Sequence, residues 1–217
     1  MDQQTIVQRT VEFVKEMLVG AEGGHDWWHI LRVWNNAKLI AKGEEVDQLV
    51  VELGALLHDI ADAKFHGGDE TIGPRLATEF LQSQGVDQSV IDHVVKIIEN
   101  ISFKGGQFER SFDSAELRVC MDADRLDALG AIGIARTFCY GGHKGRELYD
   151  PGVAPNLHMT KEEYKASTAP TINHFYEKLL LLKDLMHTET CKRIAEGRHR
   201  FMEAYLDQFY AEWNGER

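Results

Sequence analysis

The stretch ALLHDIADAKFH, residues 55–66, places polar side chains at the end of an apolar run. His58 and Asp59 are adjacent, and Asp62 follows three residues later. Buried imidazole and carboxylate groups need a hydrogen-bond partner or a bound ion. With 10 histidines in the chain, a His-Asp pair is expected by chance. The pair by itself therefore leaves two interpretations open, a hydrogen-bond network and a metal site.

Other residues that could bind a metal favour the second interpretation. His29, in HDWWHILRVW, lies at the rim of an expected apolar helix face. The segment MDADRLDALG contributes Asp122, Asp124 and Asp127 in apolar surroundings, where carboxylates need a cation or several donors. Nitrogen and oxygen ligands in an open site suit Mn²⁺, Ni²⁺, Co²⁺, Fe²⁺ or Mg²⁺, whereas structural zinc sites are closed and often rich in cysteine. We expect one such divalent ion.

The segments that must position these residues have a helical apolar period, and no stretch alternates as a strand would. Asp26, Asp47, Asp87 and Ser114 are expected N-caps, since each precedes an apolar-periodic segment. Residues 139–160 contain several glycines and prolines and are expected to form a long functional loop. The chain is therefore predicted to be all-α. Helices are expected over residues 6–18, 26–43, 47–59, 74–85, 87–100, 114–138, 172–186 and 188–213.

Composition limits the classes of function. The formal net charge of −11 disfavours binding to nucleic acids or to anionic membranes. Three cysteines without a C-x-x-C pair argue against a disulfide scaffold, and the N-terminal residues carry charges throughout. We expect a cytoplasmic protein that binds neither nucleic acid nor membrane. The long C-terminal helices leave a homodimer open.

The order H…HD…D on helices resembles the HD superfamily of metal-dependent phosphohydrolases, and it is most similar to small stand-alone bacterial members. The resemblance rests on HDWWHILRVW, ALLHDIAD and DADRLDALGAIGIA, and it extends over most of the chain. It implies an HD-domain helical bundle with additional C-terminal helices: one domain over residues 1–217, with a metal-binding core at about 20–140 and C-terminal helices at 160–217 packed on it. It also implies the metal ligands His29, His58, Asp59 and Asp124.

The resemblance makes Asp62 the catalytic candidate, because related hydrolases use an acid at this spacing to orient or deprotonate the attacking water. A carboxylate beside a metal ion can complete the activation of water on physical grounds as well. The alternative is that Asp62 caps the following turn. Phosphate oxygens require cationic partners, and each candidate could instead be a solvated surface charge or, for Arg32, part of a salt bridge. The substrate-binding candidates are Arg32, Lys64, Arg125, Arg136, Lys144 and Arg146.

The predicted function is hydrolysis of a phosphorylated small molecule. The resemblance suggests a nucleotide, with a nucleoside triphosphate cleaved to monophosphate and pyrophosphate as the specific reaction. A 5'-nucleotidase or a phosphodiesterase of the same fold is the first alternative, and a non-catalytic nucleotide sensor is the second. A metal-storing helical protein is a third, although such a protein predicts more glutamates in E-x-x-H pairs than this sequence contains.

Overall fold

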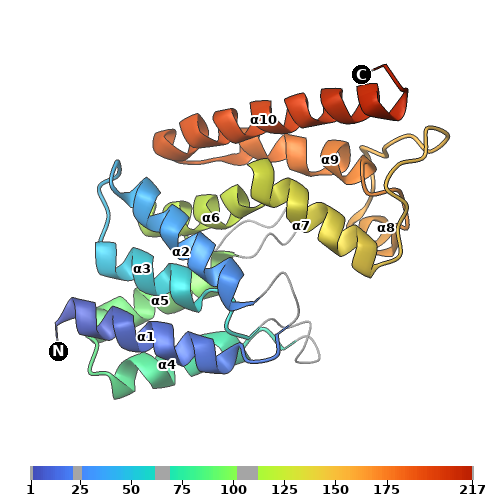
Figure 1. Cartoon of the computed structure of the whole chain (residues 1–217). Coiled ribbons are helices and arrows are strands. Elements are labelled where there is room, and N and C mark those ends of the chain that lie inside the picture. Colours follow the sequence, from blue (N-terminus) through green and yellow to red (C-terminus); the bar gives the residue numbers. More distant parts are fainter. Residues whose placement is uncertain (1, 22–25, 62–68, 102–111, 217) are drawn as a thin grey trace. The chain divides into compact units, whose positions relative to one another are not determined.

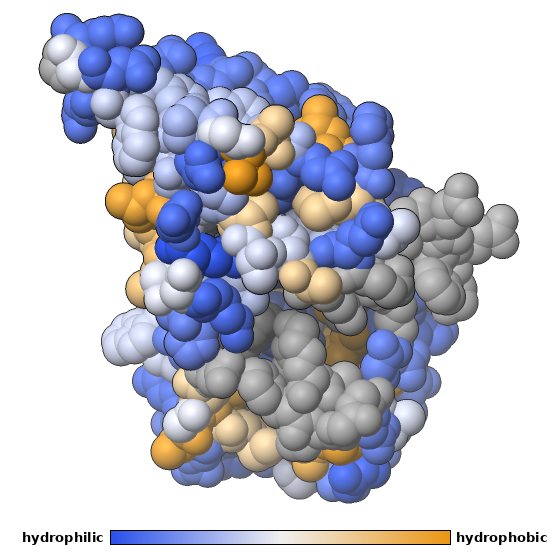
Figure 2. Space-filling model, turned by 90° about the vertical axis from the view of Figure 1, so that its right-hand side faces the viewer, coloured by the Kyte–Doolittle hydropathy of each residue, from blue (hydrophilic) through white to orange (hydrophobic). Residues whose placement is uncertain are grey.

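The computed structural model describes residues 2–21, 26–61, 69–101 and 112–216. Throughout these ranges the chain forms helices and connecting turns, with no strand, which confirms the predicted all-α class (Figure 1). None of the described helices is both long enough and apolar enough to cross a membrane. On the face in Figure 2, the described residues are mainly hydrophilic, and apolar ones gather only in small groups.

The chain divides into two compact units, residues 1–124 and 125–217, which are described separately. Unit 1 is built around α3 (Gln48–Leu57), which packs against α1 (Gln3–Met17), α2 (Trp27–Ala41) and α5 (Gln88–Ile101). Helix α4 (Ile72–Ser83) packs on α5. Every residue of α3 from Leu49 to Leu57 except Glu52 is buried, so this helix is the core of the unit.

Three of the N-cap residues predicted from the sequence form capping hydrogen bonds in unit 1. Asp26 accepts the backbone N–H of His29 at 2.9 Å, and Asp47 accepts those of Leu49 and Val50. Ser114 likewise accepts the N–H of Leu117 at the start of α6 (Ala115–Asp127), most of which belongs to this unit. These side chains satisfy amide groups that have no partner within the helix, so the predicted starts are confirmed.

Unit 2 contains α7 (Gly130–His143), the short helices α8 (Lys161–Ala166) and α9 (Asn173–Glu177), the 3₁₀ helix η2 (Leu179–Leu185) and α10 (Glu189–Trp213). The 25-residue helix α10 packs against α7 and η2. Its buried face includes Ala195, Met202 and Leu206 at helical spacing.

The single helix predicted over residues 114–138 is wrong. Helix α6 ends at Asp127 and α7 begins at Gly130, because Leu129 is extended (φ −113°, ψ 156°) and Gly130 has φ +73°. A side chain at Gly130 would be strained, and its Cβ would also lie 3.1 Å from Cγ of Arg198. The break is therefore fixed by backbone conformation and by packing.

The other helix limits in unit 2 also differ from the prediction. Helix α7 continues to His143, so the loop predicted over residues 139–160 begins later than predicted, and α8, which was not predicted, follows it from Lys161. The helix predicted over residues 172–186 is interrupted at Lys178 (φ −144°, ψ −56°), where α9 gives way to η2. Over so short a length, the periods of about 3.6 residues in an α-helix and about 3.0 in a 3₁₀ helix give nearly the same apolar pattern, so the sequence could not distinguish them.

Candidate metal centre

Three of the predicted ligands, which come from two helices of unit 1, lie close together. His29 lies in the first turn of α2, and His58 and Asp59 directly follow α3. One ligand atom from each of these residues lies within 4.8 Å of the others. The imidazole rings of His29 and His58 are 5.5 Å apart, edge to face. His29 is only 3% exposed, so most of its ring is shielded from water.

A hydrogen bond orients the imidazole of His58. Its Nδ1 lies 2.9 Å from the carbonyl oxygen of Ala55, one turn earlier in α3. Because a carbonyl group only accepts, Nδ1 must carry the proton, and the lone pair of the neutral ring is then on Nε2. This arrangement is typical of histidines that bind metals, where a hydrogen bond to one nitrogen fixes the tautomer of the other.

Asp124 on α6, the fourth predicted ligand, lies close to both histidines. Its Oδ1 lies 3.5 Å from Nε2 of His29 and 4.0 Å from Nε2 of His58. Two ligand atoms on one ion can be at most about 4.2 Å apart, twice a typical bond of about 2.1 Å. Both distances are below this limit. Asp124 can therefore share a single divalent cation with either imidazole, while a ligand atom of Asp59 lies within 4.8 Å of those of the two histidines.

The other two acids of the DADRLD segment lie elsewhere. Asp122 is fully buried, and Asp127 is 1% exposed and forms an ion pair with Arg136 at 2.6 Å. The side chain of Asp124, by contrast, is 40% exposed and remains accessible to water. Of these three acids, Asp124 is the one whose distances to the histidines fit a shared ion.

Asn36 positions α6 beside α2 and was missed in the sequence. Its side-chain amide donates to the carbonyl oxygen of Ala123 at 3.3 Å, one residue before Asp124. Asn36 is seven residues after His29, which places both on one face of α2. A polar residue on an otherwise buried helical face was the available signal, since Asn36 is only 8% exposed.

Close packing of α3 on α6 fixes the positions of His58 and Asp124. A Cβ atom added at Gly54 would lie 3.1 Å from Sγ of Cys120 and 3.3 Å from two carbon atoms of Ile97. Gly54 precedes His58 by four residues, and Cys120 precedes Asp124 by four. The contact therefore lies one turn before each ligand. Burial raises the pKa of the Cys120 thiol, so this side chain is a neutral packing group.

The predicted catalytic and substrate-binding residues are only partly described. Asp62 and Lys64 lie outside the described residues. Arg32 lies on α2 one turn after His29 and is half-buried. The roles that the sequence suggests for these three residues therefore stay hypotheses.

The remaining cationic candidates belong to unit 2 and have contacts within it. Arg125 donates to the carbonyl oxygen of Leu185 at 2.6 Å, and Arg136 pairs with Asp127. Arg146 donates to the carbonyl oxygen of Ser167 at 2.6 Å. The exposed Lys144 lies 5.6 Å from the ring centre of Tyr140, and Arg146 lies 5.7 Å from the same ring. The contacts of Arg125, Arg136 and Arg146 hold elements of unit 2 together.

Comparison with known proteins places the cluster in a family context. Residues 27–129 match the model of the HD domain family, and this match contains all four predicted metal ligands. An HD-superfamily hydrolase of Bacillus thuringiensis is similar in structure, with 42% identity, a TM-score of 0.81, and coverage of 98% of this chain and 99% of that one. YpgQ of Bacillus subtilis is 37% identical over 201 residues, which cover 90% of this chain and 88% of YpgQ. The structure of YpgQ in complex with ADP has 34% identity, a TM-score of 0.77, and coverage of 98% and 97%.

Proposed function

Because the chain belongs to the HD superfamily and is a metal-dependent phosphohydrolase, we propose that its substrate is a nucleotide and that His29, His58, Asp59 and Asp124 hold its divalent ion. The specific reaction that we propose is cleavage of a nucleoside triphosphate to monophosphate and pyrophosphate. The complex of YpgQ with ADP supports a ligand of the nucleotide class. The choice of bond rests on the resemblance that the sequence suggests.

One observation carries the metal part of the proposal: ligand atoms of both imidazoles and of Asp124 lie within the span of a single ion. His58 presents Nε2 because its Nδ1 proton is donated to Ala55. Asp59 and Asp124 supply negative charge, which offsets the charge of a divalent cation. A bound cation of this kind acts as a Lewis acid on a phosphoryl oxygen and lowers the pKa of water.

The chain itself supplies the remaining steps of the proposed mechanism. Asp62 orients the attacking water and accepts its proton, a contribution of about 10²–10⁴-fold for a positioned general base. Arg32 and Lys64 neutralise charge on the phosphate chain. In this hydrolysis the water oxygen forms a bond to the α-phosphorus, and the bond between the α-phosphorus and the bridging oxygen breaks. The bridging oxygen leaves with pyrophosphate.

The test separates metal binding from turnover. The protein is stripped with a chelator, and Mn²⁺, Ni²⁺, Co²⁺ and Mg²⁺ are added back singly with nucleoside mono-, di- and triphosphates. Asp124→Ala is expected to lose metal binding in calorimetry together with activity. Asp62→Ala is expected to keep the metal and to lose at least about 100-fold in rate. Asp92→Ala changes an exposed acid on α5 and serves as the matched control, expected to keep both.

The products distinguish the proposal from its alternatives. Monophosphate and pyrophosphate from a triphosphate support it, whereas inorganic phosphate from a monophosphate identifies a 5'-nucleotidase. Hydrolysis of a diester identifies a phosphodiesterase. Nucleotide binding without turnover under any of these metals would show a sensor and contradict the proposed reaction.

A further inference from the structure

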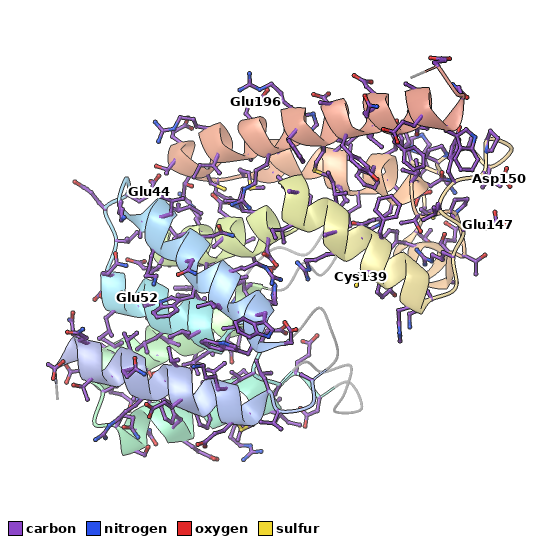
Figure 3. All side chains as sticks on the ribbon, in the orientation of Figure 1. Glu44, Glu52, Cys139, Glu147, Asp150 and Glu196 are labelled. Atoms are coloured by element: carbon purple, nitrogen blue, oxygen red, sulfur yellow. The ribbon has the colours of Figure 1, made fainter. Side chains whose placement is uncertain are left out.

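A pocket of about 390 Å³ lies within unit 2 and has no role in the proposed reaction. It is formed by the loop around Asp150, by α9 and by the C-terminal turns of α10. Figure 3 labels Asp150 on this loop, beside the end of α10. Its walls include the rings of Tyr149, Tyr176 and Tyr210, two prolines, and the polar side chains of Asp150 and Asn173. No lysine, arginine or histidine is among the described residues that line it.

The aromatic part of the pocket is held by ring packing. The ring centre of Tyr149 lies 5.3 Å from that of Tyr210 and 5.1 Å from that of Trp213, both edge to face. The hydroxyl groups of Tyr210 and Tyr176 are hydrogen-bonded, and burial and this bond raise the pKa of Tyr210. The faces of neutral tyrosine rings carry negative electrostatic potential.

The polar part of the pocket includes two oxygen acceptors. Oδ1 of Asp150 accepts the backbone N–H of Gly152 at 2.7 Å, which fixes the carboxylate at the start of the loop. Asn173 is 1% exposed and donates its side-chain N–H to the carbonyl oxygen of Val153 at 3.0 Å. Neither Oδ2 of Asp150 nor the amide oxygen of Asn173 receives a donor from the described residues. A buried side chain in the pocket wall thus offers an acceptor that the protein leaves without a donor.

We propose that this pocket binds an organic cation of the alkylammonium class, in particular a methylated or quaternary ammonium group. The tyrosine rings of the wall can attract such a cation, Asp150 supplies the opposite charge, and none of the described lining residues is basic. Phosphate and carboxylate ligands would be repelled by the Asp150 carboxylate and by the net charge of −11 on the chain. The ligand can be a free amine or the modified lysine of another protein, because both present the same group.

The test compares a cation with a neutral molecule of the same shape. Choline and its uncharged carbon isostere 3,3-dimethylbutan-1-ol are titrated into the full-length protein and followed by calorimetry and by ligand-detected NMR. Saturable one-to-one binding of choline is expected, with the isostere at least about tenfold weaker. Equal binding of the two, or no saturable binding of choline, would overturn the proposal.

Three variants locate the binding site. Asp150→Asn keeps an oxygen for the Gly152 N–H but removes the charge, and Tyr149→Leu removes one ring face; each is expected to weaken choline binding about tenfold. Glu196→Gln is the matched control, because it makes the same change of charge about 21 Å along α10 from Tyr210. If Glu196→Gln weakens binding as much as Asp150→Asn, the effect reflects net charge and the site is refuted. Circular dichroism confirms that each variant is folded.

A second titration identifies the source of the ammonium group. Short peptides that carry trimethyllysine or unmodified lysine are compared with free choline. Tighter binding of the trimethyllysine peptide supports the site with a protein as the partner, whereas tighter binding of choline supports it with a free amine. Binding of either probe that persists undiminished in Tyr149→Leu and Asp150→Asn contradicts the assignment of the pocket.

Discussion

The close contact between α3 and α6 at Gly54 predicts that Gly54→Ala weakens both the fold and the metal centre. The added Cβ would lie 3.1 Å from Sγ of Cys120 and 3.3 Å from two carbon atoms of Ile97. Ordinary contacts between such atoms are about 3.5–4.0 Å, so the helices must separate by a few tenths of an ångström. His58 and Asp124 lie one turn beyond this contact, and the separation moves them apart.

The magnitude follows from two opposing effects. Overpacking of a well-filled core costs about 1–3 kcal/mol. Replacing glycine by alanine inside a helix recovers about 1 kcal/mol of helix propensity. We therefore expect a net loss of about 1 kcal/mol in the free energy of unfolding. Displaced ligands should also lower the metal affinity by about tenfold, the lower end of the effects seen when groups that support a metal site are altered.

The assay is a double-mutant cycle with Cys120→Ala, measured by urea unfolding and by calorimetric titration with Mn²⁺. Removal of Sγ makes room for the new methyl group, so the double variant should recover stability and metal affinity relative to Gly54→Ala. The expected coupling is about 1 kcal/mol. Gly197→Ala is the control, because Gly197 is exposed within α10 and nothing lies within 4 Å of an added Cβ. This control should stabilise the protein by about 1 kcal/mol through propensity alone. The reasoning is refuted if Gly54→Ala behaves like Gly197→Ala, or if Cys120→Ala does not relieve its effect.

Three further predictions concern buried polar groups. Asn36→Ala removes the side-chain bond to the carbonyl of Ala123 and should cost about 1 kcal/mol, with weaker but measurable Mn²⁺ binding; unchanged affinity would contradict the positioning role. Arg136→Leu removes the ion pair with the buried carboxylate of Asp127 and should cost about 3 kcal/mol in urea unfolding, and a loss below about 1 kcal/mol would show that the pair is not important. Burial lowers the pKa of His174 to about 4, so the folded protein binds fewer protons than the unfolded chain between pH 6.5 and 4. The free energy of unfolding is therefore highest above pH 6.5 and decreases as the pH is lowered, by about 2 kcal/mol from pH 7 to pH 5. His174→Gln should flatten this dependence in a series of urea titrations.

Much of the helical framework was accessible from the sequence because its signals are local. An N-cap aspartate needs only the amide groups two or three residues ahead of it, and Asp26 and Asp47 make those bonds. The apolar period likewise depends on neighbours one turn away. The break at Gly130 was missed because its cause is partly distant: Arg198, 68 residues later, occupies the space where a side chain would point.

For the candidate metal centre, the sequence by itself determined the residue types, their order and their places on helices. His58-Asp59 at the end of an apolar helix and Asp124 in an acidic segment were recognisable because their types and spacing match a known pattern. What the tertiary structure decided is which atoms meet. The distances from Asp124 to two histidines depend on how closely α6 approaches α2 and α3, through Asn36 and Gly54. Such contacts join residues that are 66 or more positions apart, and periodicity carries no information about them because it describes only one helix at a time.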